Sequence, residues 1–210
     1  VSSAASDVYK RQALIVHSGI YRQHFRTEPA FATHLQGALN LKCTTLTQES
    51  SHCFAFDVSD GSCSAHVALD AIADLLPQFS GKYAILCVGD ERPNKQTEWN
   101  HTPHCFVAIL ALEGTGPRLE RVSFDETKSD PERMIISHFD HNKKANISIE
   151  YGEYQPQPVH ETDREYSGHQ SWLSGEHMHA FHQRLDRKTD SFTHRIIDRT
   201  GKTTSAHWGR

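Results

Sequence analysis

The chain has 210 residues, 37% of them hydrophobic, and a formal net charge of −4 at neutral pH. This composition is sufficient for a hydrophobic core and gives no reason to expect a nucleic-acid surface. No apolar run approaches the roughly 18 residues of a membrane span. Five cysteines without a repeating spacing favour reduced thiols over a disulfide framework. We therefore expect a cytoplasmic protein, or one delivered into a host cell, with the oligomeric state left open.

The two ends of the chain differ from its middle. Residues 1–12 resemble a translated sequencing-adapter run, so the native start is expected to be missing and they are excluded from fold reasoning. Residues 13–198 are predicted to form one α+β domain. Residues 199–210 carry no clear pattern and are expected to be an irregular tail.

Two helices are expected in the first third of the chain. Residues 13–40 have loosely spaced apolar positions and are predicted to be helical, with an interruption at Pro29. Residues 63–76 give the clearest helical pattern, and Pro77 ends it. The apolar stripe of this helix has the period of an α-helix and consists of Ala65, Ala68, Leu69, Ile72, Leu75 and Leu76.

The period changes to that of strands after this helix. Residues 82–88 are predicted to be a strand, and residues 104–112 are apolar on both faces, as in a central strand. Residues 113–118 carry a turn signal, and residues 119–124 form the returning strand. We therefore expect an antiparallel hairpin in which the last two strands pair.

The C-terminal third adds a helix over 131–139, a strand over 146–154 and a helix over 172–185. Together these elements predict an α+β fold with a small antiparallel sheet and helices packed on it.

Cys63 is the candidate nucleophile because it opens the clearest helix. Ser62 or Asp60 is expected to cap the helix, which leaves Cys63 in the first turn. The unpaired N–H groups and the helix dipole would there favour the thiolate, and Gly61 would let a substrate approach closely. The alternative is a small buried cysteine with a purely structural role.

His104 and Asp125 are the candidate base and orienting acid. His104 begins an apolar strand just after a polar loop, and Asp125 ends the strand that follows. In the expected hairpin the two side chains are diagonal neighbours, roughly 7 Å apart at Cβ or less. A carboxylate there orients the imidazole and stabilises its charged form. A register slip of one residue would substitute Glu126.

Two further groups of residues are weighed as site components. Gln96 or Asn100, in the loop before His104, could supply an oxyanion donor, although a solvated loop explains both. Glu176, His179 and His182 lie on one face of the late helix and could bind zinc, although they lack the spacing of a zinc protease. A polar helix surface is the preferred interpretation, so no metal or other cofactor is predicted.

The order Cys63, His104, Asp125 resembles that of the papain-like superfamily, in which a His starts one strand and an acid ends the next. This resemblance implies a papain-like α+β fold and catalysis by these three residues. A permuted branch, the SUMO-protease-like peptidases and YopJ-type acetyltransferases, is also similar. There Gln170 would match the glutamine of that branch, but Ser174 and Gly175 stand where Cys-Gly is wanted.

The leading hypothesis is thiol-dependent acyl transfer or amide hydrolysis by a peptidase, isopeptidase, deamidase or acyltransferase. Cys63 would attack a carbonyl of a protein or peptide substrate, His104 would move the proton and Asp125 would orient His104. One alternative is a catalytically degenerate effector domain that binds a protein partner. The other is a His-rich metal-binding protein.

Overall fold

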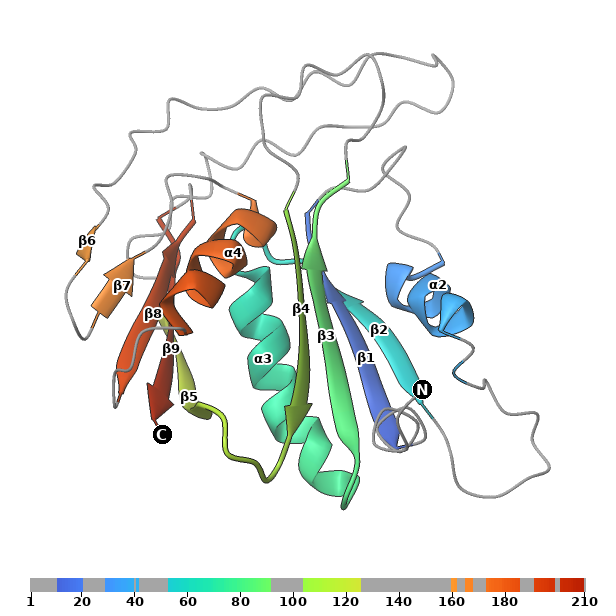
Figure 1. The fold of residues 1–210 in the computed structure, drawn as a ribbon. Coiled ribbons are helices and arrows are strands. Elements are labelled where there is room, and N and C mark those ends of the chain that lie inside the picture. The colour runs from blue at the N-terminus through green and yellow to red at the C-terminus, as the bar shows by residue number, and fades with distance from the viewer. Residues whose placement is uncertain are drawn as a thin grey trace, which may run out of the picture.

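The computed structural model describes residues 11–20, 29–39, 41, 53–91, 104–125, 160–161, 165–167, 173–185, 191–198 and 201–209. In this part of the chain, two β-sheets face each other with two helices between them, and a further helix covers the outer face of one sheet (Figure 1).

The first sheet has the strand order β2-β1-β3-β4. β1 (Gln12–Ser18) pairs in parallel with β2 (Phe54–Val58) and β3 (Tyr83–Gly89), and β4 (Cys105–Ala111) runs antiparallel to β3. Every residue of β1 is buried. The helix predicted over 13–40 is therefore wrong in its first part, because a continuous apolar run fits a central strand as well as a helix.

The second sheet has the order β5-β9-β8-β7-β6 and is also mixed. β8 and β9 form an antiparallel hairpin, β5 pairs with β9, and β7 runs parallel to β8. Its strands are β5 (Arg118–Asp125), β6 (His160–Glu161), β7 (Glu165–Ser167), β8 (Phe192–Ile197) and β9 (Thr203–Gly209). The irregular tail expected over 199–210 thus contains a strand that pairs on both sides.

The predicted hairpin between β4 and β5 is wrong. The connection after Ala111 leaves the first sheet and enters the second, so β4 pairs with β3 while β5 pairs with β9. β4 is consequently an edge strand, and its residues alternate between exposed and half-buried instead of being buried on both faces.

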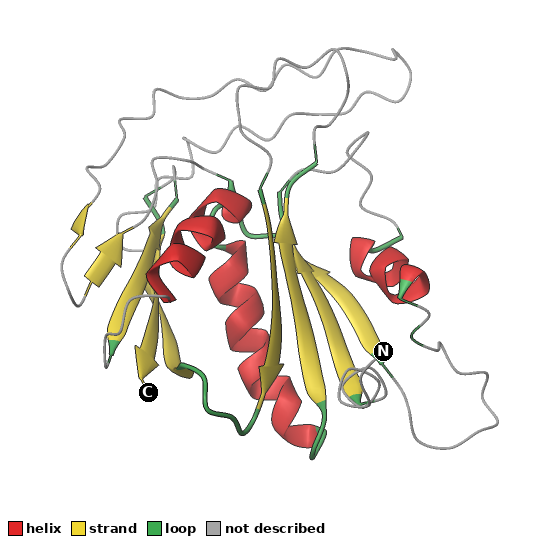
Figure 2. Cartoon of the chain, in the orientation of Figure 1, coloured by secondary structure: helices red, strands yellow, loops and turns green. Residues whose placement is uncertain are grey.

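α3 (Ser64–Leu75) and α4 (Ser174–Leu185) lie between the sheets, as the cartoon also shows (Figure 2). A short 3-10 turn, η2 (Leu76–Gln78), follows α3. α2 (Phe31–Ala38) packs on the other face of the first sheet. The main core joins the two sheets to α3 and α4: it includes Leu14, Val16, Ala68, Leu69, Ile72, Leu86, Met178, Phe181, Phe192 and Trp208.

The α+β class is confirmed, and so are the helices near 63–76 and 172–185. The single small antiparallel sheet is not found, because both sheets are mixed. The helix predicted over 131–139 and the strand predicted over 146–154 lie outside the described residues. None of the described helices is long and apolar enough to cross a membrane.

Candidate functional site

The site begins at the tight turn that connects β2 to α3. Gly61 has a φ of +54°, which L side chains rarely adopt, and the Cys63 N–H donates to the Asp60 carbonyl at 3.1 Å. Cys63 is itself the N-cap of α3, and no side chain caps the helix. The expected capping by Ser62 or Asp60 is therefore wrong, and the thiol lies one position before the first helical residue.

The Cys63 side chain is fully buried. Its Sγ contacts the carbonyl oxygens of Ile196 at 4.0 Å and Lys202 at 3.9 Å. Burial is the main reason that the pKa of the thiol rises to about 12, and the carboxylates of Asp198 and Asp60 raise it further. The pKa thus moves in the opposite direction to the one expected from a helix start, because desolvation outweighs the helix dipole.

Asp198, which follows β8, and Lys202, which precedes β9, hold this segment in place. The Asp198 carboxylate accepts the Ser62 N–H at 2.9 Å, and the Lys202 ammonium lies 2.7 Å from the Asp60 carboxylate. The Asp198 carboxylate also fills the space where a Cβ on Gly61 would lie. These contacts hold the turn before Cys63 against the end of β8 and the start of β9.

A chain of buried serine hydroxyls links the same turn to β1 and α4. Ser64 lies at its centre, 2.8 Å from the Ser18 hydroxyl and 2.6 Å from the Ser174 hydroxyl. Ser174 also lies 3.1 Å from the Gly61 carbonyl and 3.3 Å from the Ser62 carbonyl. The sequence did not reveal this chain, because its members come from β1, α3 and α4.

His104 lies on the far side of the start of α4. Its ring stacks on His179, with centroids 4.5 Å apart and an interplanar angle of 20°. A Cβ on Gly175 would lie 2.7 Å from the His104 carbonyl oxygen, so only glycine allows this close approach. Since Ser174 contacts the turn before Cys63, the first two residues of α4 lie between that turn and His104.

Asp125 ends β5 in the second sheet, where it pairs with Thr203. His104 precedes β4, which belongs to the first sheet. The expected diagonal contact between His104 and Asp125 depended on the β4–β5 hairpin, and this basis is lost. The structure therefore removes the strand pairing on which that contact rested, and the grouping of Cys63, His104 and Asp125 stays a prediction.

The proposed zinc ligands lie on α4 with different exposures. Glu176 is buried, whereas His179 and His182 are exposed. His179 Nε2 lies 3.1 Å from Gln183 Nε2, and the His182 ring lies 6.4 Å from that of Phe106. Within the described ranges, no group of three or more His, Cys, Asp or Glu side chains could hold a metal ion. Glu126, Gln96, Asn100 and Gln170 lie outside these ranges.

A buried pair of histidines links α3 to the second sheet. His66 Nε2 lies 2.9 Å from His194 Nδ1, and His66 Nδ1 lies 2.8 Å from the Thr204 hydroxyl. Burial lowers the pKa of His66 to about 3 and lowers the pKa of His194 well below its usual range. Both imidazoles are therefore neutral at pH 7, and they hold α3 against β8 and β9 as hydrogen-bonding groups.

Comparison with known proteins identifies the fold. No protein-family model and no curated protein matches the sequence. Among solved structures, the chain is similar to AbyA1, a tetronic acid condensing enzyme (TM-score 0.62, 10% identity, 96% of this chain and 79% of that one). It is also similar to a variant of OleA from Xanthomonas campestris (TM-score 0.62, 12% identity, 96% and 76%). A second variant of that OleA, bound with cerulenin, is another match (TM-score 0.61, 13% identity, 96% and 74%).

These likenesses show that the chain has a fold similar to that of AbyA1 and OleA. The papain-like fold that the sequence resemblance implies is not confirmed. Its order of Cys, His and acid is a coarse pattern that several thiol enzymes of unrelated fold can share.

Proposed function

We propose that this protein performs thiol-dependent acyl transfer, with Cys63 as the residue that accepts the acyl group. The observation that carries the proposal is the position of Cys63 at the start of α3, the helix between the two sheets, in a fold similar to condensing enzymes. A thiol at such a helix start is a suitable acyl acceptor once it is exposed, because an acyl-enzyme thioester divides a difficult transfer into two easier steps.

The transfer has two balanced steps. Cys63 Sγ attacks the carbonyl carbon of an acyl thioester, the bond between that carbon and the leaving sulfur breaks, and the Cys63 proton ends on the leaving thiol. A second nucleophile then takes the acyl group, and its proton returns to Cys63. Because the sulfur is buried and its pKa is about 12, the backbone at Ile196 and Lys202 that covers it has to move away before the first step.

The roles of His104 as base and Asp125 as its orienter stay predictions from the sequence. His104 precedes β4 of the first sheet and Asp125 ends β5 of the second, so both roles depend on where these side chains lie relative to the thiol. Peptidase, isopeptidase and deamidase chemistry on a protein substrate likewise stays a proposal, to which the likeness to condensing enzymes adds no support.

The test is acylation by octanoyl-N-acetylcysteamine, followed by intact-mass and peptide mass spectrometry. We expect one octanoyl adduct on Cys63 that hydroxylamine removes and that Cys63→Ala abolishes. Cys105→Ser is the matched control, because Cys105 is exposed and reports unspecific acylation. Adducts confined to Cys105, or none on the folded wild-type protein, would overturn the proposal.

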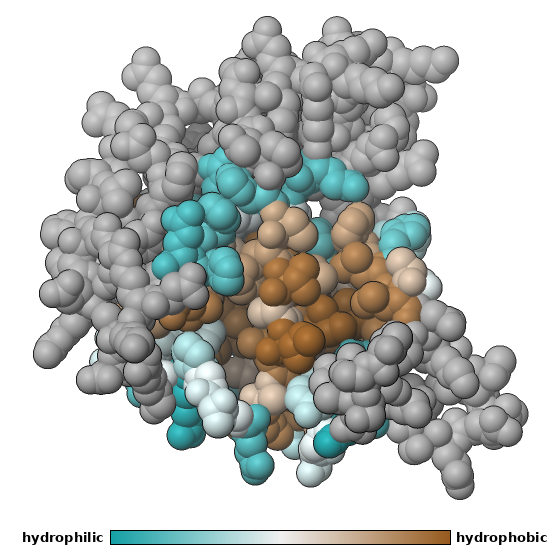
Figure 3. Space-filling model, viewed as in Figure 1, coloured by the Kyte–Doolittle hydropathy of each residue, from teal (hydrophilic) through white to brown (hydrophobic). Residues whose placement is uncertain are grey.

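A second candidate is a non-catalytic domain that binds a protein partner. Two observations favour it: the Cys63 thiol is buried and protonated, and apolar side chains gather on the surface of the first sheet (Figure 3). Val107 and Ile109 of β4 are more than half exposed on that strand, at 59% and 58%. The same thioester experiment separates the candidates, since a removable adduct on Cys63 excludes this one.

A further inference from the structure

The space between the two sheets is only partly filled by helices. α4 packs beside the first half of α3 and ends at Leu185, and the chain from β4 to β5 crosses between the sheets farther along α3 (Figure 1). A cavity of about 730 Å³ remains, lined in part by Trp208, whose ring lies 5.1 Å from that of Phe181. This volume is in the ordinary range for sites that bind small molecules.

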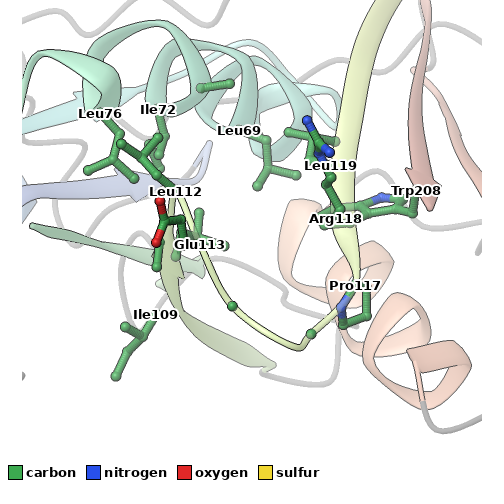
Figure 4. A pocket seen from close by; sticks show the side chains of 15 residues that line it. Leu69, Ile72, Leu76, Ile109, Leu112, Glu113, Pro117, Arg118, Leu119 and Trp208 are labelled. Atoms are coloured by element: carbon green, nitrogen blue, oxygen red, sulfur yellow. The ribbon is translucent and has the colours of Figure 1, made fainter. Parts of the chain in front are cut away.

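Aliphatic side chains line this cavity together with polar groups of the connection from β4 to β5. It is formed by the second half of α3, the end of β4, the start of β5 and the indole of Trp208 (Figure 4). Cys63 does not line the cavity, and Leu69, the first residue of α3 that does, lies six residues after it, roughly 9 Å along a helix axis. The cavity is therefore separate from the candidate acyl-transfer site. Its apolar residues are Leu69, Ile72, Leu76, Leu110, Leu119 and Trp208.

Two polar groups give the cavity a direction. Arg118 lies at the rim next to Leu119 and Trp208, while Glu113 lies apart from it beside Leu112 (Figure 4). Arg118 is exposed and forms no ion pair with the described residues. Trp208 is only 6% exposed, and among the described residues its buried Nε1 has no hydrogen-bond partner. An unpartnered indole N–H is uncommon in a protein core.

We infer that this cavity binds an aliphatic carboxylate of medium chain length. The alkyl chain lies along α3 between Leu69 and Leu76, and the carboxylate lies at Arg118, away from Glu113. A guanidinium binds a carboxylate through two parallel N–H donors, whereas a neutral or cationic head group would leave Arg118 unused. Burial of each methylene against the leucine and isoleucine side chains favours binding. The inference does not depend on the reactivity of Cys63.

The test is isothermal titration of the purified protein with dodecanoate below its micelle concentration, with dodecanol as the uncharged analogue. We expect saturable binding of one dodecanoate per chain and an affinity at least tenfold lower for Arg118→Gln. Dodecanol binding should change less than twofold in that variant. Arg121→Gln, a matched exposed arginine on β5 that does not line the cavity, should retain wild-type affinity for dodecanoate.

A second variant tests the position of the alkyl chain. Ala73 is an exposed residue of α3 at the cavity wall, so Ala73→Phe should occupy the space and weaken both ligands while circular dichroism stays unchanged. If this variant fails to fold, quenching of tryptophan fluorescence by 2-bromododecanoate, whose bromine lies beside the carboxylate, replaces it. Trp208→Phe should then remove most of the quenching. Non-saturable binding, equal dodecanoate affinity in Arg118→Gln, or quenching that survives Trp208→Phe would overturn the inference.

Discussion

Acidification should destabilise this protein through the buried pair of His66 and His194. Both side chains are fully buried, and His66 donates or accepts hydrogen bonds at both ring nitrogens, to Thr204 and to His194. Protonation would place a charge between α3 and the second sheet without a solvent shell. The folded state therefore resists protonation of His66, whereas the unfolded chain does not.

The size of the effect follows from the two pKa values of His66. The pKa is about 3 in the folded state and 6.5 for an exposed histidine, as in the unfolded chain. Between these values the unfolded state binds more protons, so stability is lost as the pH falls from 6.5 toward 3. At pH 4.5, two units below the unfolded pKa, the loss from His66 alone is about 3 kcal/mol. His194 acts in the same direction.

The assay is urea unfolding at pH 7.0 and pH 4.5 for the wild type, His66→Gln and His182→Gln. Glutamine at position 66 keeps a hydrogen-bonding group that does not titrate. Between pH 7.0 and pH 4.5, the free energy of unfolding of His66→Gln should therefore fall by about 3 kcal/mol less than that of the wild type. His182 is exposed on α4, and its variant should follow the wild type.

The comparison uses the change with pH in each variant, so a constant cost of the substitution cancels. Carboxylates elsewhere in the chain also contribute to acid sensitivity, but they contribute equally to all three proteins. Equal pH dependence in the wild type and His66→Gln would refute the argument that a buried neutral imidazole links stability to pH.

Three further predictions concern the turn before α3. At pH 8, iodoacetamide should label Cys63 about 1000-fold more slowly in the folded protein than in urea, because burial raises the pKa of this thiol from its ordinary 9.0 to about 12 and reduces the thiolate by that factor; similar rates by mass spectrometry in both conditions would contradict the burial of Cys63. Gly61→Ala should cost more stability in urea unfolding, by about 1–3 kcal/mol, than Gly81→Ala, which has a similar positive φ and open space around it. Ser174→Ala should cost about 1–3 kcal/mol by the same assay, because it removes a hydroxyl that buried polar groups share, and an unchanged midpoint would show that water replaces it.

Local patterns predicted the helices well and the sheet pairing poorly. The stripe from Ala65 to Leu76 repeats at 3.6 residues, and a helix forms there because periodicity and burial agree. The turn signal after Leu112 is equally local, yet it does not decide which strands pair. β5 pairs with β9, roughly 80 or more residues later, and this long-range pairing separates β4 from β5.

The candidate site was predictable in one residue and not in its surroundings. Cys63 at the start of a helix is visible in the sequence, and the structure places it there. Its pKa is set by burial against the carbonyls of Ile196 and Lys202 and by the Asp198 carboxylate, which lie 133 to 139 residues away. No pattern near Cys63 indicates them, because contacts across the central layer join segments that are far apart in sequence.

The burial that stabilises α3 also determines what chemistry Cys63 can perform. Asp60, Asp198 and Lys202 surround the thiol with two carboxylates and one ammonium, so the local charge disfavours a thiolate even before desolvation is considered. An acyl thioester at the same position carries no charge and would avoid this penalty. The surroundings therefore disfavour the free thiolate far more than the acylated form, and the difficult step of the proposed reaction is deprotonation of Cys63.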